Sequence, residues 1–365
     1  MMRILHVVTL MSADGAYGGP ARVAVNQAEA LVRRGHSVTI AAAGRDTVAG
    51  PGSVEYRLFA PRIVIPGTGF AGLAAPSMLP WAMRRLSSFD VVHIHLARDL
   101  VTLPMATLAR LRMRPFVTQT HGMVDASDHW LAAPIDAVAT RIALRNAAAV
   151  FHLTERERED LVSVARQSVR LHKLTNAVPV LPERRARATL EVLFLARLHP
   201  RKRADLFVDM ATIILREQDS VTFALVGPDE GDGSAVEGRQ SPRLRWEGAL
   251  DPARTAERMA AASIYVLPSM DEPYPMSVLE AMAIGVPVVI SDSCGLADAV
   301  TRLKCGIVFP AGDLLGLVDA VRRLLGDDAL RLEMGARGRA AAQLEFGVDA
   351  IAQQLEQHYE AASGT

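Results

Sequence analysis

The sequence predicts an α/β protein made of two doubly wound domains, each with a parallel sheet. The chain has 365 residues, more than one hydrophobic core usually organises. Short apolar runs alternate with helical patterns along its whole length, which is typical of βαβ units. Half of the residues are apolar and 22% are charged, which is enough apolar material for buried sheets and argues against disorder.

The first half contains a continuous series of predicted strands and helices. The clearest helix is Pro20–Arg34, where apolar residues form one stripe and Gly35 ends the helix. Residues Pro61–Pro80 are rich in Gly, Pro and Ala, and we expect a long irregular loop there. The predicted strands are Ile4–Thr9, Ser37–Ala42, Val54–Phe59, Val91–His95, Phe116–Thr120, Val150–Leu153 and Arg170–Leu174.

Residues Asn176–Arg187 combine two prolines with a basic cluster and show no periodicity, so they are the predicted linker. We therefore expect domains at 1–180 and 181–345, with a last helix in 346–365 that can pack back on the first domain. The predicted strands of the second domain are Glu191–Ala196, Val221–Val226, Leu244–Glu247, Ile264–Leu267, Val286–Ile290 and Gly306–Phe309. Its predicted helices are Arg203–Arg216, Ala253–Ala261, Met276–Ile284 and Leu314–Leu325, and the last helix of the chain is Val348–Ala361.

Charge and apolar patterning narrow the class of partner. Basic and acidic residues both number 40, so no global field favours nucleic acid. No apolar run reaches the roughly 18 residues of a membrane span, and the apolar run at 4–10 fits a buried strand better than a signal peptide. Cys294 and Cys305 lack metal or redox spacing, which favours a reduced cytoplasmic protein.

Two glutamates flank a predicted helix start in the second domain. The amides of Met276, Ser277 and Val278 and the positive end of the helix dipole are suited to a phosphate. Glu272 and Glu280 can accept hydrogen bonds from sugar or ribose hydroxyls at the two ends of a diphosphate. The alternative is a solvated loop charge followed by an ordinary helix residue.

A basic cluster follows the first strand of the second domain. Arg197 can bind an anionic diphosphate through its guanidinium fork, and Lys202 can bind it as a point charge. A solvated basic loop before a helix is the alternative interpretation. No aromatic residues interleave with these charges, which argues against nucleic acid.

Taken together, these residues resemble the retaining glycosyltransferases of family 4, and the resemblance covers nearly the whole chain. It implies the two-domain GT-B fold, with Rossmann-like domains facing a cleft, and hexosyl transfer from a nucleotide diphosphate sugar. It implies that Arg197 and Lys202 hold the diphosphate, Glu272 the donor sugar and Glu280 the ribose. It also implies no metal cofactor, a donor-binding second domain and an acceptor-side first domain.

The first domain supplies matching residues. Gly18 and Gly19 lie between the first strand and the first helix, without the G-x-G-x-x-G spacing of a dinucleotide site. They resemble the family's glycine loop, which implies contact with the donor phosphates and sugar, although a plain turn is possible. His121 ends a strand before a glycine, and its position resembles that of a family histidine beside the transferred sugar.

Several features leave alternatives open. Pro275 stands where many family members have glycine, which leaves the transferred sugar undefined. His93 and His95 share a strand face and could ligate a metal, but no third ligand is evident, so His95 is expected to line the acceptor side. Asp125 and Asp128 invite the same metal interpretation, which the resemblance opposes.

The predicted function is therefore retaining transfer of a hexose to an acceptor hydroxyl in glycan, polysaccharide or glycolipid synthesis. A sugar-nucleotide epimerase and a noncatalytic sugar-nucleotide scaffold are the alternatives. The expected partners are a nucleotide sugar and a sugar or lipid-linked sugar acceptor. A peripheral contact with the inner membrane face is also possible, since basic and apolar side chains gather in the first domain. They are Trp81, Arg84, Arg85, Arg110, Arg112 and Arg114.

Overall fold

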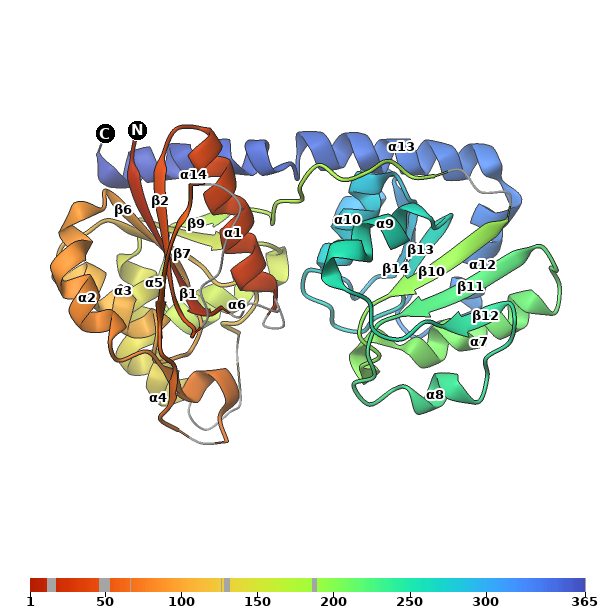
Figure 1. The fold of residues 1–365 in the computed structure, drawn as a ribbon, viewed down its shortest axis with the longest axis horizontal. Helices are drawn as coiled ribbons and strands as arrows, with labels where there is room; N and C mark the ends of the chain where they lie inside the picture. The colour runs from red at the N-terminus through yellow and green to blue at the C-terminus, as the bar shows by residue number, and fades with distance from the viewer. Residues whose placement is uncertain are drawn as a thin grey trace. The chain divides into compact units, whose positions relative to one another are not determined.

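The computed structural model describes residues 1–11, 18–45, 53–65, 67–125, 127, 132–185 and 189–364 (Figure 1). The chain divides into two compact units, Met1–Ala177 with Val348–Thr365 and Val178–Gly347. The boundary between the units lies after Ala177, whereas the predicted boundary lies after residue 180. The first unit thus contains two stretches of sequence that lie far apart in the chain.

The first unit is built on a parallel sheet with strand order β3-β2-β1-β6-β7-β8-β9. Alternate residues of β1 point to opposite faces, so Leu5 and Val7 join one hydrophobic cluster while Ile4 and Val8 join the other. Helices cover both faces of the sheet. Because its strands are buried on both sides, their sequences are nearly continuous apolar runs. The strands are β1 Arg3–Leu10, β2 Ser37–Ala43, β3 Glu55–Phe59, β6 Val91–His95, β7 Phe116–Gln119, β8 Ala149–His152 and β9 Leu171–Lys173.

The segment predicted as one irregular loop, Pro61–Pro80, is partly regular, and this prediction was wrong. Arg62–Ile63 (β4) pairs antiparallel with Leu73–Ala74 (β5), and α2 begins at Met78. Pro80 is compatible with that helix because it lies in the first turn, where an amide has no intrahelical acceptor. The helices of this unit are α1 Gly18–Arg33, α2 Met78–Arg85, α3 Thr102–Leu111, α4 Ala132–Ile135, a π-helical turn Asp136–Thr140, α5 Arg141–Asn146, α6 Glu155–Ala165 and α14 Val348–Ser363.

Helix α14 packs on the first unit beside α1, as Figure 1 shows. Its Ile351 and Leu355 share a buried cluster with Ala28 and Leu31 of α1. Glu356 binds Arg34 at 2.6 Å, and it also binds His36 at 2.7 Å. The last helix is therefore part of the core of the first unit.

The second unit repeats the design with a parallel sheet of strand order β12-β11-β10-β13-β14-β15. The strands are β10 Leu190–Leu195, β11 Val221–Val226, β12 Leu244–Trp246, β13 Ile264–Leu267, β14 Val288–Ser291 and β15 Gly306–Phe309. The helices are α7 Ala204–Leu215, α8 Ser234–Glu237, α9 Thr255–Ala260, α10 Met276–Ile284, α11 Ala297–Leu303, α12 Leu314–Gly326 and α13 Asp328–Leu344.

In each sheet the strand order reverses between two neighbouring strands. The reversal lies between β1 and β6 in the first unit and between β10 and β13 in the second. Ligands of open α/β sheets bind beyond the carboxyl ends of strands at such a point. Across the described ranges, no helix has the length and apolar character that a membrane crossing requires.

Candidate active site

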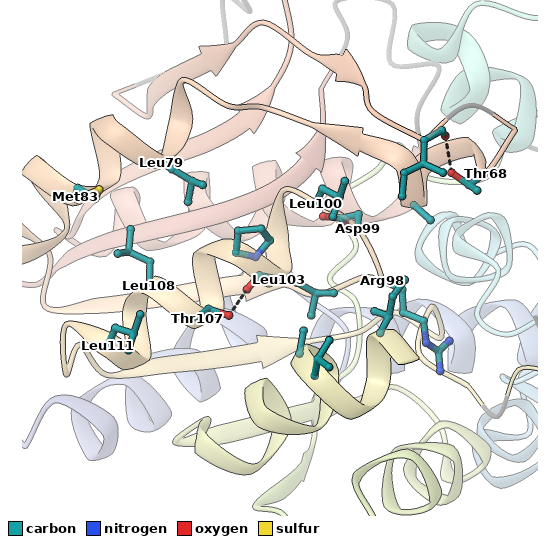
Figure 2. Close-up of a pocket in the computed structure, with 16 residues that line it drawn as sticks. Thr68, Leu79, Met83, Arg98, Asp99, Leu100, Leu103, Thr107, Leu108 and Leu111 are labelled. Carbon is teal, nitrogen blue, oxygen red and sulfur yellow. Dashed lines mark hydrogen bonds between the residues drawn. The ribbon is translucent and has the colours of Figure 1, made fainter. Parts of the chain in front are cut away.

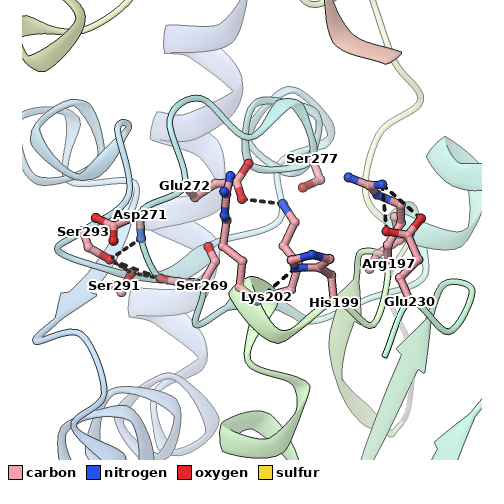
Figure 3. A network of polar contacts seen from close by, with 12 residues as sticks. Arg197, His199, Lys202, Glu230, Ser269, Asp271, Glu272, Ser277, Ser291 and Ser293 are labelled. Atoms are coloured by element: carbon pink, nitrogen blue, oxygen red, sulfur yellow. Dashed lines mark hydrogen bonds and ion pairs between the residues drawn. The ribbon is translucent and has the colours of Figure 1, made fainter. Parts of the chain in front are cut away.

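The carboxyl ends of β10 and β13 bring Lys202 and Glu272 together (Figure 3). Lys202 Nζ lies 2.5 Å from a Glu272 carboxylate oxygen, and the two side chains are 15% and 13% exposed. Lys202 ends a 3-10 turn whose start is capped by His199, which accepts a hydrogen bond from the Arg201 amide at 3.1 Å. The predicted cation and carboxylate therefore form one partly buried pair.

The loop that carries Glu272 is held by hydrogen bonds to the segment that ends and follows β14. Asp271 has a left-handed φ of 48°, and its amide donates to Ser293 Oγ at 3.2 Å. The Glu272 carbonyl accepts from the Gly295 amide at 2.8 Å. Ser291 Oγ donates to the Ser269 carbonyl at 2.5 Å, which ties β14 to the start of this loop. The carboxylate is thus positioned before any ligand binds.

Helix α10 begins at Met276, as predicted, directly after Pro275. The amides of Met276 and Ser277 lie in the first turn, where an α-helix offers no intrahelical acceptor. The Val278 amide differs, because it donates to the Pro275 carbonyl at 3.1 Å. Two of the three predicted amides are therefore better placed for an anion than the third.

The remaining predicted side chain of this helix, Glu280, is 8% exposed. Nearby, the Tyr265 hydroxyl lies 2.8 Å from Ser277 Oγ and 3.1 Å from the Leu195 carbonyl. The Tyr265 hydroxyl donates to Ser277 Oγ, and the Leu195 carbonyl is a second acceptor for the same proton. Burial raises the pKa of Tyr265 well above its usual value. This buried bridge orients Ser277 at the helix start.

Arg197 follows β10 and is bound by a residue that the sequence analysis did not single out. Its Nη1 lies 3.0 and 2.8 Å from the two oxygens of Glu230, and the arginine side chain is 62% exposed. The Glu230 loop is shaped by Asp229, which accepts from the Gly231 and Gly233 amides, each at 2.9 Å. Those bonds lower the pKa of Asp229. The predicted residues Arg197 and Lys202 therefore each have a carboxylate partner in the second unit.

In the first unit, His121 follows β7 with a left-handed φ of 54°. The buried carboxylate of Glu157 fixes this corner, because it accepts from Thr120 Oγ1 at 2.5 Å and from the Gly122 and Leu153 amides, each at 2.6 Å. Burial lowers the pKa of His121 to about 3, so its imidazole is neutral at pH 7. Glu157 was not predicted from the sequence. It could have been found from its place three residues after Thr154, because that spacing is typical of a helix capping box.

His121 is one end of a chain of hydrogen-bonded side chains. His121 Nε2 lies 2.8 Å from His95 Nδ1, and His95 Nε2 lies 3.0 Å from His6 Nδ1. His6 Nε2 lies 3.4 Å from the Tyr359 hydroxyl, which lies 2.6 Å from His93 Nδ1. Burial lowers the pKa of His6 to about 3 and holds the pKa values of His93 and His95 well below the usual value.

This chain changes the expectations for two histidines. His95 is buried beneath His121, so the prediction that it lines the acceptor side was wrong. The third imidazole that the sequence did not reveal is His6, and ligand nitrogens of His6, His93 and His95 lie within 4.8 Å of one another. Hydrogen bonds account for His6 Nδ1, His95 Nε2 and His93 Nδ1, whereas His93 Nε2 is buried with no hydrogen-bond partner among the described residues.

The remaining candidates of the first unit are partly described. Gly18 and Gly19 are the first residues of α1, which starts two residues before the predicted Pro20. A Cβ at Gly19 would meet no atom within 4 Å. Residues 12–17 of the glycine loop and Asp128 lie outside the described residues. Asp125 forms an ion pair with Arg98 at 3.1 Å.

The second unit offers both positive groups, which can bind a diphosphate, and carboxylates, which can bind hydroxyls. Two cations and a helix N-terminus can stabilise negative charge on a leaving diphosphate, while carboxylates can bind hydroxyls. In the part of the chain that the structure describes, no group of His, Cys, Asp or Glu residues other than His6, His93 and His95 has its ligand atoms close enough together to hold a metal ion.

Comparison with known proteins agrees with this geometry. The model of the family described as "Glycosyl transferase 4-like domain" matches residues 18–177. That of "Glycosyl transferases group 1" matches residues 189–327. The chain is 29% identical over 364 residues to phosphatidyl-myo-inositol mannosyltransferase of Mycobacterium leprae, covering 95% of each sequence. It is 26% identical to alpha-D-kanosaminyltransferase of Streptomyces kanamyceticus, covering 79% of this chain and 82% of that enzyme.

Solved structures share the fold. HepE of Anabaena, in complex with UDP and glucose, superposes with a TM-score of 0.75 at 18% identity, covering 98% of this chain and 99% of HepE. Sucrose-phosphate synthase of Thermosynechococcus elongatus gives a TM-score of 0.75 at 21% identity, covering 99% and 98%. Both predicted halves are thus matched by glycosyltransferase domains, and the chain belongs to the family 4-like glycosyltransferases of the GT-B fold.

Proposed function

We propose that this hexosyltransferase is a retaining enzyme that moves a hexose from a nucleotide diphosphate sugar to an acceptor hydroxyl. In this proposal Arg197, Lys202 and the start of α10 bind the donor diphosphate. Glu272 binds the donor sugar, and Glu280 binds the ribose. Gly18, Gly19 and His121 of the first unit contribute to the same donor site.

The observation that carries the proposal is the Lys202–Glu272 pair at 2.5 Å, held beside a helix N-terminus. A partly buried lysine supplies positive charge where the glycosidic C–O bond to the diphosphate breaks, and the adjacent carboxylate accepts from sugar hydroxyls. Electrostatic stabilisation of a leaving group is worth most where solvent is excluded.

The proposed reaction proceeds on one face of the sugar. The acceptor oxygen forms the new bond to the anomeric carbon as the bond to the diphosphate breaks, and the acceptor proton passes to a leaving phosphate oxygen. The products are a glycoside of unchanged anomeric configuration and a nucleoside diphosphate. Arg197, Lys202 and the helix dipole supply the positive charge in this scheme, so we propose that no metal is required.

We propose that the acceptor is a sugar or a lipid-linked sugar, used at the cytoplasmic face of a membrane. Two relatives support this: a phosphatidyl-myo-inositol mannosyltransferase and a diphospho-undecaprenol N-acetylgalactosaminyltransferase. Arg84, Arg85, Arg110 and Arg112 are exposed in the first unit, where they can contact anionic lipid.

Release of nucleoside diphosphate from a panel of nucleotide sugars tests the donor site. Glu272→Gln and Lys202→Ala are each expected to lower kcat/KM by about 100-fold or more, since each removes a group that acts on the reacting centre. Arg302→Ala, which breaks the exposed Arg302–Glu345 pair of the same unit, is the control and should retain activity.

Unchanged turnover in both site variants would overturn the assignment. An inverted product anomer would refute retention, and turnover that stops with chelator would refute the metal-free scheme. Sugar conversion without any acceptor would identify an epimerase instead.

A further inference from the structure

An apolar pocket of about 530 Å³ lies in the first unit, and its described lining residues do not include His121, Gly18 or Gly19 (Figure 2). It is formed mainly by α2, α3 and the π-helical turn, and its size falls within the roughly 300–1,000 Å³ of small-molecule sites. Figure 2 shows Met83, Leu108 and Leu111 at one end and Arg98 at the other, with Leu103 between the two ends. The pocket is therefore elongated.

Among the described lining residues, every polar side chain already has a hydrogen-bond partner in the protein. Four lining residues are polar, and the protein itself supplies a hydrogen-bond partner for each of them. Arg98 binds Asp136 at 2.9 Å, and Asp99 accepts from the Thr102 amide at 2.6 Å. Thr68 and Thr107 donate to backbone carbonyls at 2.7 and 3.0 Å. A ligand segment that fills this space must therefore be hydrocarbon.

Exposed side chains mark the mouth of the pocket. The lining residues Met83, Leu111 and Val138 are 52%, 68% and 71% exposed, and neighbouring Met113 is 89% exposed. Large apolar side chains gathered on a surface are typical of an interaction site.

The same surface is strongly basic in a chain of zero net charge. Residues 60–89 and 100–124, which supply α2, α3 and their flanks, contain no aspartate or glutamate. Arg112 donates to the Met83 carbonyl at 2.9 Å, which places its guanidinium at the mouth. The arginines of these two segments are Arg62, Arg84, Arg85, Arg110, Arg112 and Arg114.

We propose that this pocket binds one hydrocarbon chain of an anionic lipid, with the lipid phosphate held by the arginines at the mouth. An apolar interior selects the chain, and arginines from two segments without acidic residues select a phosphate-bearing head group. The inference rests on the proposed lipid-linked acceptor for its biological meaning, but the binding itself does not require catalysis.

Titration of the whole protein with dodecyl phosphate below its micelle-forming concentration tests the pocket. Calorimetry should give one site per chain, and methyl NMR should place it by shifts of Leu79, Leu103 and Leu108. Glycerol phosphate, which lacks the chain, should bind at least about tenfold more weakly, because burial of a hydrocarbon chain supplies most of the free energy. Dodecyl maltoside, which lacks the charge, should bind with intermediate affinity.

Leu111→Asp and Val138→Asp place a carboxylate at the mouth and should weaken dodecyl phosphate at least about tenfold. Both positions are exposed, so folding should be retained, and the unfolding temperature checks this. Leu315→Asp is the matched control because Leu315 is 70% exposed in the second unit.

Arg84→Ala with Arg85→Ala should weaken dodecyl phosphate but not dodecyl maltoside. Flotation with phosphatidylcholine vesicles, with and without phosphatidylglycerol, then shows whether the same variants lose binding to a bilayer. Equal binding of glycerol phosphate, or no effect of Leu111→Asp on a folded protein, would overturn the proposal. Donor turnover is measured separately, so failure of the lipid-binding proposal can be distinguished from failure of the proposed transferase function.

Discussion

At the proposed donor site, each predicted cation already has a carboxylate partner within its own unit. Lys202 lies against Glu272 and is mostly buried, whereas Arg197 lies against Glu230 and is mostly exposed. A diphosphate must compete with Glu230 for the exposed guanidinium. Such a pair contributes only about 0.2–1 kcal/mol, so the competition is mild.

Glu230→Gln should therefore strengthen binding of a nucleoside diphosphate about two- to fivefold, since it releases Arg197 from its ionic partner. Calorimetric titration measures the dissociation constant. Glu237→Gln removes the same charge from an exposed position on α8 and should change affinity less. Weaker binding in Glu230→Gln would instead show that Glu230 itself contacts the ligand.

Sequence reasoning found side chains that follow strands but not those that depend on which strands become neighbours. Arg197, Glu272 and His121 each follow a predicted strand, so their place at the sheet edge was predictable. Glu230 lies in a loop without periodicity. His6 meets His93 because β1 pairs with β6 in a register that aligns these two residues, and strand order cannot be read from a single strand.

Among the elements, α6 does more than cover the sheet. Thr154 caps the helix by accepting from the Glu157 amide at 3.2 Å, and the Glu157 carboxylate accepts from Thr120, Gly122 and Leu153. The start of this helix thereby determines the backbone conformation at His121. The first turn of a helix and the backbone on both sides of His121 thus meet at one side chain.

Glu157→Gln should lower the free energy of unfolding by about 1–3 kcal/mol, because an amide cannot accept all of these buried hydrogen bonds. If the corner positions His121, kcat should also fall while the KM of the donor changes less. Urea unfolding and steady-state kinetics measure the two effects. Glu159→Gln, exposed on the same helix, should change stability by less than about 0.5 kcal/mol.

Element prediction succeeded where periodicity was strong and failed where Gly and Pro dominated. Helix α10 begins at the predicted Met276, and the predicted strand Val91–His95 is β6. The segment containing β4, β5 and α2 was predicted as a loop because prolines and glycines interrupt its pattern. That segment contributes one wall of the apolar pocket, so the pocket could not be predicted from the sequence.

Across the whole molecule, the two units differ in their histidine content. Nine of the ten histidines lie in the sequence of the first unit, and His199 is the one in the second. His6, His93, His95 and His121 are buried with lowered pKa values. The unfolded chain binds protons at these groups near pH 6.5, whereas the folded chain does not until about pH 3 in the case of His6 and His121.

Stability of the first unit should therefore fall as pH falls below about 6.5, by about 1.4 kcal/mol per buried histidine between pH 7.5 and 5.5. Calorimetry at these pH values should show the transition of the first unit moving to lower temperature by at least about 5 °C more than that of the second. Equal shifts of both transitions would contradict this assignment. The second unit serves as the internal control.

The return of α14 to the first unit has a consequence for the order of biosynthesis. Residues 348–363 leave the ribosome after every residue of the second unit has been made. Domains usually fold as they emerge, so the continuous second unit can finish folding while the first still lacks a helix. Until Tyr359 arrives, His6 and His93 lack its hydroxyl. The domain that is translated first is therefore the one completed last.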